Sequence, residues 1–238
     1  MTYKEIYDIA VPEKKRKEER WNIWVTIAVR PLSVLMTIPL AKTKVKPTTI
    51  TKWSVLSLLL GAAFIIFGSF PYMTFVGWLF FFLWAILDGV DGNLARATNQ
   101  CSYLGDLWDT LGGYLAMIMM YYTMGIYAFF DNNLVEICDK YLILLLGGIT
   151  AMICIFPRLL LHKKKSYGVE SSAVKEYTDT TNFSFSKVIA ANIIAPSGFM
   201  QIIFLAGLFL HITNIILVGY FVINLVIMIV SLYRLLSE

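Results

Sequence analysis

The chain has 238 residues, of which 58% are hydrophobic and 15% are charged, and its mean hydropathy is +0.68. This composition excludes an ordinary soluble domain and indicates a membrane protein. The three cysteines form no C-x-x-C pair and the two histidines are isolated, which argues against a disulfide framework, a zinc site or histidine-based catalysis.

The N-terminal segment, residues 1–48, is expected to lie outside the bilayer core. Its charged run, residues 13–20, is typical of a solvated helix beside anionic headgroups. Residues 21–41 are apolar, but Arg30 and Pro31 interrupt them, and neither half is long enough to cross a bilayer. We interpret this stretch as an interfacial amphipathic helix.

Six apolar segments follow, each close to the length of about 20 residues that a membrane-spanning helix needs. They cover residues 51–70, 72–97, 105–131, 139–162, 187–210 and 212–236. The sequence therefore predicts an all-α integral membrane protein with six transmembrane helices, in which residues 49–238 form the membrane domain.

The distribution of charge predicts the orientation. With both termini on one side, all of the 20 lysines and arginines except Lys140 fall on that side, as the positive-inside rule requires of the cytoplasmic face. The net charge of +4 thus follows from topology, and we expect no nucleic-acid partner. The localisation expected is the cytoplasmic membrane, with both termini and any site near residues 88–109 on the cytoplasmic side.

Three aspartates lie at a predicted membrane boundary, where ionisable groups are costly and usually functional. Asp88 and Asp91 are three residues apart and share a helix face, and a short turn brings Asp109 of the next helix near them. Three converging carboxylates would repel one another without a cation, and pairing with Arg96 would neutralise only one. Hard oxygen ligands suit Mg²⁺ (or Mn²⁺) and do not suit zinc.

The full spacing around these aspartates resembles the signature of the CDP-alcohol phosphotransferase (CDP-alcohol phosphatidyltransferase) family. The matching residues are Asp88, Asp91, Gly92, Ala95, Arg96, Gly105 and Asp109. The family pattern ends in a fourth aspartate, at whose position this chain has Gly113. Pro47 and Thr51 match a further family pattern, Pro-Asn-x-x-Thr, in which Thr48 replaces the asparagine.

The resemblance implies a six-helix bundle with a cytoplasm-facing cavity, usually in a homodimer. It implies an enzyme of phospholipid biosynthesis that moves a substituted phosphate from a CDP-linked donor to an alcohol acceptor and releases CMP. The donor is a CDP-diacylglycerol or a small CDP-alcohol, and membrane lipid surrounds the protein. The metal ligands implied are Asp88, Asp91 and Asp109.

The donor-binding residues expected are Thr51, Gly92, Ala95, Arg96 and Gly105. The small residues, with Gly89, would let phosphate or ribose approach the helix backbone, and the forked guanidinium of Arg96 would hold a phosphate. Two alternatives stay open at this point. The threonine would equally serve as a helix N-cap, and the glycines would equally serve helix packing.

The acceptor step is less determined, because Gly113 can neither bind metal nor deprotonate a hydroxyl. Asp106 lies on nearly the same helix face and is the candidate base beside Asp109, although seven residues of helix separate it from Gly113 by about 10 Å. Arg158 and Lys187 are candidates to bind a phosphate on the acceptor, and snorkelling is the alternative explanation of Arg158.

Two other functions are considered. The loss of the fourth aspartate is compatible with a weakened or inactive relative that binds nucleotide or lipid, or acts as a scaffold. A small-solute transporter would use the aspartates as an ion site, but the absence of repeats and of paired broken helices disfavours it.

Overall fold

The computed structural model describes residues 2–19, 21–68, 71–168, 188 and 190–237. In these residues the chain is helical and no strand is found. The chain divides into two compact units, Met1–Ala116 with Phe183–Ile202, and Met117–Asn182 with Ile203–Glu238. Helices α6 (Tyr103–Phe130) and α11 (Met200–Leu210) cross this division and contribute to both units. The predicted division between residues 48 and 49 concerns the membrane and stays a prediction.

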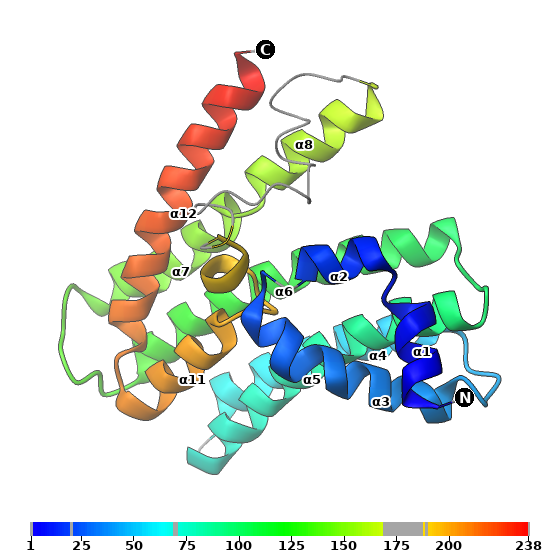
Figure 1. The fold of residues 1–238 in the computed structure, drawn as a ribbon. Helices are drawn as coiled ribbons and strands as arrows, with labels where there is room; N and C mark the ends of the chain where they lie inside the picture. Colours follow the sequence, from blue (N-terminus) through cyan, green and yellow to red (C-terminus); the bar gives the residue numbers. More distant parts are fainter. Residues whose placement is uncertain (1, 20, 69–70, 169–187, 189, 238) are drawn as a thin grey trace. The chain divides into compact units, whose positions relative to one another are not determined.

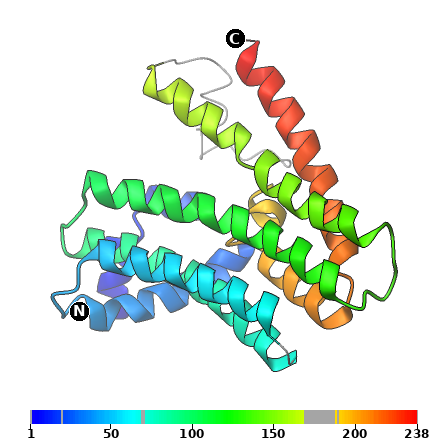
Figure 2. The same cartoon turned by 180° about the vertical axis from the view of Figure 1, so that it is seen from behind.

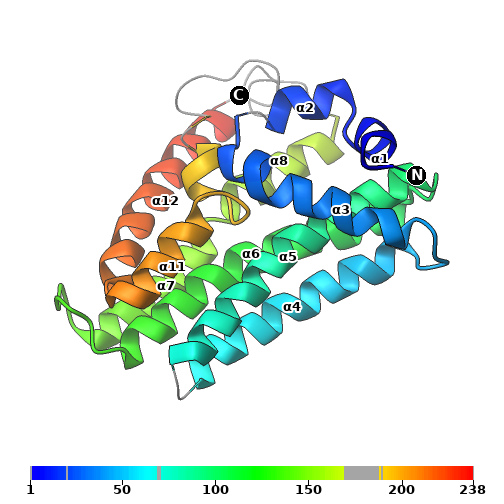
Figure 3. The ribbon, with the colours of Figure 1, turned by 60° about the horizontal axis from the view of Figure 1, so that its bottom comes forward.

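The centre of the first unit is a pair of long antiparallel helices, α4 (Pro47–Phe67) and α5 (Pro71–Ala97), which lie side by side in Figures 1 and 3. Glycines allow their backbones to approach, because a Cβ atom at Gly61 would lie 2.9 Å from the carbonyl oxygen of Gly77. Nearer the other end, an apolar cluster joins the two helices; it consists of Ile50, Ile86, Leu87, Val90 and Leu94.

The N-terminal segment of the first unit is helical throughout most of its length. Helix α1 (Tyr3–Ala10) begins with a capping box in which Thr2 and Glu5 bond each other's backbone amides, and α2 (Glu13–Glu19) carries the charged run. A π-helical turn, η1 (Val25–Val29), continues directly into α3 (Arg30–Leu40). Helices α1 and α3 both contact α5, and Figure 3 shows α3 crossing over it.

The second unit contains α7 (Lys140–Ile153), α8 (Phe156–Ser166) and α12 (Thr213–Leu236), with the remaining parts of α6 and α11. Helix α12 contacts both α7 and α8, as Figure 2 shows from behind. Helices α6 and α7 approach closely, since a Cβ atom at Gly125 would lie 2.8 Å from the Cα atom of Gly147. On α12, Asn224 donates a 3.0 Å hydrogen bond to the hydroxyl of Tyr121 on α6.

Five helical segments in the described part of the chain are long and apolar enough to cross a membrane. They correspond to the first, second, third, fourth and sixth predicted spans. The fourth span is interrupted between α7 and α8, where Pro157 lacks the N–H that would bond the carbonyl of Ile153. Exposed valines at positions 222, 226 and 230 of α12 recur every four residues and form an apolar face suited to lipid.

The fifth predicted span, residues 187–210, is not found as one continuous helix in its described part. A π-helical turn, η2 (Ala190–Ile194), precedes α11, and turn residues separate the two. Pro196 cannot donate a helical hydrogen bond, and the amide of Phe199 instead donates to the carbonyl of Asn192 at 2.7 Å. The prediction of six continuous spans is therefore not confirmed.

Candidate functional site

A cavity of about 560 Å³ opens in the first unit, between α2, η1, α3, α4, α5 and the start of α6. It falls in the volume range of small-molecule sites. The aspartates that line it are Asp88, Asp91, Asp106 and Asp109. The other predicted site residues that line it are Thr51, Gly92, Ala95, Arg96 and Gly105. The fold thus brings the signature residues of α5 and α6 to one cavity together with Thr51 of α4.

Asp91 is the most enclosed of the four carboxylates, with 5% of the residue exposed. Its Oδ2 atom accepts a 2.6 Å hydrogen bond from the hydroxyl of Thr51. Thr51 lies in the second turn of α4, whose N-cap is Lys46, so the alternative that a threonine caps this helix is wrong. The function of Thr51 in the structure is to hold a carboxylate in the cavity wall.

Asp106 and Asp109 lie in the first two turns of α6, three residues apart and on one face of that helix. Both are exposed and both line the cavity. Gly113, one turn further along, does not line it. A Cβ atom at Gly113 would meet no atom within 4 Å, so close packing does not require glycine there.

The described residues contain no group of three histidine, cysteine, aspartate or glutamate side chains close enough to hold a metal ion. Asp88, Asp91 and Asp109 nevertheless line the same cavity, and their oxygen atoms are the donor type that Mg²⁺ and Mn²⁺ take. Mg²⁺ is usually held by one or two carboxylates together with substrate phosphates and water. The donor set fits a cation whose remaining ligands come from a bound diphosphate.

Arg96 ends the signature on α5 and folds back over Gly92. A Cβ atom at Gly92 would lie 3.3 Å from the guanidinium nitrogens, so glycine leaves room for Arg96 as well as for a ligand. The Nε atom of Arg96 donates to the carbonyl of Ala10 at 2.7 Å, and one terminal nitrogen donates to Oδ1 of Asn93 at 3.2 Å. Arg96 therefore also ties α1 to α5.

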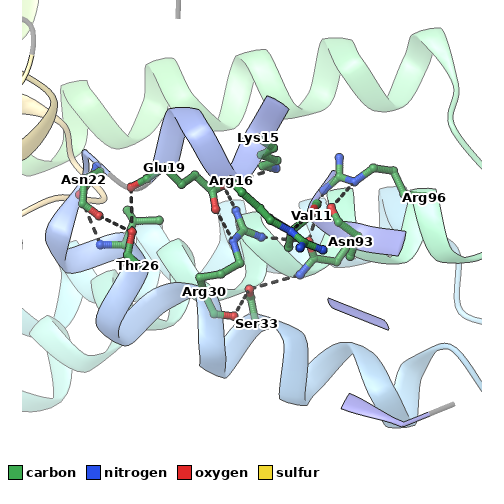
Figure 4. Close-up of polar contacts among 12 residues, drawn as sticks. Val11, Lys15, Arg16, Glu19, Asn22, Thr26, Arg30, Ser33, Asn93 and Arg96 are labelled. Carbon is green, nitrogen blue, oxygen red and sulfur yellow. Dashed lines mark hydrogen bonds and ion pairs between the residues drawn. The ribbon is translucent and has the colours of Figure 1, made fainter. Parts of the chain in front are cut away.

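Beside Arg96 lies a second arginine that sequence reasoning placed only in an interfacial helix. Arg30 of α3 is 7% exposed and lines the cavity. Its Nε atom donates to Glu19 at 2.7 Å, a second nitrogen pairs with the same carboxylate, and a third atom, Nη1, donates to Oδ1 of Asn93 at 2.9 Å (Figure 4). Two guanidinium groups thus share one amide oxygen, and Glu19 neutralises one of them.

Gly89 has a packing function that the sequence left open. A Cβ atom there would lie 2.9 Å from Cβ of Ser33 and 3.0 Å from its hydroxyl oxygen. The same hydroxyl accepts a 3.2 Å hydrogen bond from Asn93. Gly89 therefore allows α3 to approach α5 closely enough to place Arg30 beside the signature.

The charged run also contributes to the cavity, which the prediction of a simply solvated helix missed. Lys15 and Glu19 are half-buried and line it, whereas Lys17 and Glu13 form an exposed ion pair of 2.8 Å. Both pairs have the same i, i+4 spacing, so no signal in the sequence distinguishes the inner pair from the outer one.

The described structure does not test the two residues predicted to bind an acceptor phosphate. Arg158 is exposed on α8 in the second unit, so its relation to the cavity stays a prediction. Lys187 lies outside the described residues. Of the polar residues around Pro196, Ser197 lines the cavity, whereas Asn192 accepts a 2.9 Å bond from the amide of Ile23.

The sequence model of the CDP-alcohol phosphatidyltransferase family matches residues 44–233, which include α4, α5, α6 and all the predicted site residues. The comparison with curated proteins found no matching sequence.

Proposed function

The chain belongs to the CDP-alcohol phosphatidyltransferase family, and on that premise we propose that it is an active transferase of the membrane. It moves a substituted phosphate group from a CDP-linked donor to an alcohol acceptor and releases CMP. The observation that carries this proposal is that Asp88, Asp91, Asp109 and Arg96 all line the same cavity. The donor is a CDP-diacylglycerol or a small CDP-alcohol.

Asp88, Asp91 and Asp109 would hold Mg²⁺ or Mn²⁺ together with the donor diphosphate. When bound, the cation neutralises the diphosphate and the charge that develops on departing CMP. The carboxylates are negatively charged, as the diphosphate is, and therefore cannot neutralise it themselves. This assignment predicts metal-linked binding of CDP, so calorimetric titration in EDTA should show much lower affinity than titration with Mg²⁺. Undiminished affinity in EDTA would contradict it.

Arg96 would bind a phosphate oxyanion of the donor. Two of its nitrogens bond Ala10 and Asn93, which fixes the guanidinium plane in the cavity wall over Gly92. Preorganised donors of this kind stabilise charge without the cost of reorganisation. Ala95 and Gly105, which also line the cavity, leave space for the nucleotide, and Thr51 acts through its hydrogen bond to Asp91.

We assign the acceptor step to Asp106 and Asp109. Both line the cavity, and Gly113 does not, which supports a base at the start of α6. Asp106 would accept the proton of the acceptor hydroxyl, and the acceptor oxygen would then attack the β-phosphorus as the bond to CMP breaks. Asp106→Asn should abolish turnover and spare CDP affinity; unchanged turnover would eliminate this role.

We further propose a homodimer in the cytoplasmic membrane, with both termini and the cavity on the cytoplasmic side. The asymmetry of lysine and arginine residues supports the orientation. Arg158 and Lys187 remain the proposed contacts for a phosphate on the acceptor.

The alternative is a relative that binds a nucleotide or lipid without turnover, and Gly113 in place of the fourth aspartate favours it. The transferase forms CMP, whereas a relative that only binds its ligand does not. Purified protein should be screened with Mg²⁺ or Mn²⁺ against CDP-diacylglycerol and small CDP-alcohols, each combined with a panel of alcohol acceptors, and CMP should be measured. Metal-dependent CMP formation that requires an acceptor supports the transferase. CDP binding without CMP formation from any pair would support the alternative.

A further inference from the structure

Helix α2 brings a lysine into the cavity from a part of the chain that precedes the family match, which begins at residue 44. Lys15 lines the cavity together with the four aspartates and Arg96. Its side chain is 31% exposed. A lysine that loses hydration in a cavity wall is costly unless an anion compensates its charge.

The protein compensates Lys15 only weakly. Among the described residues, the nearest carboxylate oxygen is Oε1 of Glu19, 3.8 Å from Nζ, which is beyond hydrogen-bonding distance. The same carboxylate is engaged by two nitrogens of Arg30. Burial, followed by the positive charges of Arg30 and Arg96, lowers the pKa of Lys15 to about 8. An incoming anion would therefore find an ammonium group that has no carboxylate within hydrogen-bonding distance among the described residues.

The backbone of α2 is fixed on both sides, so Lys15 has a defined position. Glu19 joins the helix to Arg30, which in turn bonds Asn93 of α5 (Figure 4). At the other side Arg16 donates to the carbonyl of Val11 at 2.7 Å and pairs with Asp8 at 2.6 Å. Contacts with α1, α3 and α5 thus hold α2, and with it Lys15, at the cavity.

The charges around Lys15 indicate what it binds. Lys15 and Arg96 are two cations in the wall of one cavity, and the positive charge of Lys15 acts electrostatically on Asp88, Asp91 and Asp109. An oxyanion placed between the cations would satisfy both. We propose that Lys15 is a further substrate-binding residue, whose ammonium group binds a phosphate oxyanion of the donor diphosphate or of a phosphorylated alcohol acceptor.

This inference rests on the proposed function, and binding measurements separate the two. CDP and glycerol 3-phosphate should be titrated calorimetrically, each with Mg²⁺, into the wild type, Lys15→Gln, Lys15→Arg and Lys17→Gln. Lys17 is a matched control, because it lies on the same helix but its side chain is 62% exposed and outside the cavity. Thermal unfolding in detergent should confirm that the variants are folded.

We expect Lys15→Gln to weaken the binding of at least one probe about tenfold, which is the effect of losing a charge-assisted hydrogen bond. Lys15→Arg should retain most of the affinity, and Lys17→Gln should match the wild type. If Lys15→Gln loses affinity for CDP, Lys15 binds the donor diphosphate. If it loses affinity for glycerol 3-phosphate alone, Lys15 binds the phosphate of the acceptor. If the wild type binds no CDP, the proposed function fails, while Lys15-dependent binding of glycerol 3-phosphate would still support this inference. Equal affinities of wild type and Lys15→Gln for both probes, or no binding of either, would overturn it.

Discussion

The hydroxyl of Thr51 donates a 2.6 Å hydrogen bond to Oδ2 of Asp91, and both residues are almost completely buried. The bond joins α4 to α5 at the level of the cavity. A carboxylate in such a position needs hydrogen-bond donors to remain charged. The pair thus connects two separate sequence patterns, Pro47…Thr51 and Asp88…Asp109, through one contact.

Thr51→Val keeps the shape of the side chain and removes its donor. The carboxylate of Asp91 would lose a buried partner, at a cost of about 1–3 kcal/mol, so we expect CDP affinity in Mg²⁺ to fall about tenfold. Calorimetry measures this effect. Thr49→Val on the same helix is the control, because Thr49 does not line the cavity and should bind CDP like the wild type. Equal affinities of the two variants would contradict the function assigned to Thr51.

Arg96→Lys retains the charge and loses the planar fork. Lysine cannot bond Ala10 and Asn93 while also facing the ligand, so we expect CDP affinity to fall about tenfold with little change in thermal unfolding. The matched control is Arg234→Lys, since Arg234 is exposed on α12 and does not line this cavity. Wild-type affinity in Arg96→Lys would reduce Arg96 to a structural anchor.

These contacts indicate how much the sequence could predict. Long apolar segments and the signature spacing correctly predicted α4, α5, α6 and α12, because both signals are local. The fifth span was not confirmed, because Pro196 and the bonds of Asn192 lie within an apolar segment whose composition alone suits a continuous helix. Lys15 could not be separated from Lys17, since only tertiary packing decides which face of α2 meets the cavity. Arg30 was missed for the same reason, as its partners are Glu19 and Asn93, which is 63 residues away.

Gly113→Asp restores the side chain that the family signature has at this position. A Cβ atom there meets nothing within 4 Å, so the variant should fold normally. Because Gly113 does not line the cavity and Asp106 does, we expect the rate of CMP formation to remain within about twofold of the wild type. An increase of an order of magnitude would show that the missing aspartate limits the wild type and would contradict the assignment of Asp106.

The affinity for the probe that Lys15 binds, CDP or glycerol 3-phosphate, should fall as pH rises through about 8, the value to which burial lowers the pKa of Lys15. Phosphate binds the ammonium form of Lys15, which predominates below this pH. Above it the affinity should therefore fall by up to about tenfold per pH unit. The charged groups that interact with Lys15 are Glu19 on α2, Arg30 on α3, Asp88, Asp91 and Arg96 on α5, and Asp109 on α6. Lys15→Arg stays charged throughout and should abolish this dependence. Calorimetry between pH 7 and pH 9.5 provides the test, and an unchanged pH profile in Lys15→Arg would contradict it.

The most direct test of the transferase function is the rate of CMP formation by purified protein from the best donor and acceptor of the screen. We expect the wild type to form CMP with Mg²⁺ and to stop in EDTA. Asp91→Asn should lose at least about a hundredfold in rate, because one anionic ligand is removed from the cavity. CMP formation that continues in EDTA, or that is unaffected by Asp91→Asn, would contradict the proposed function of the cavity.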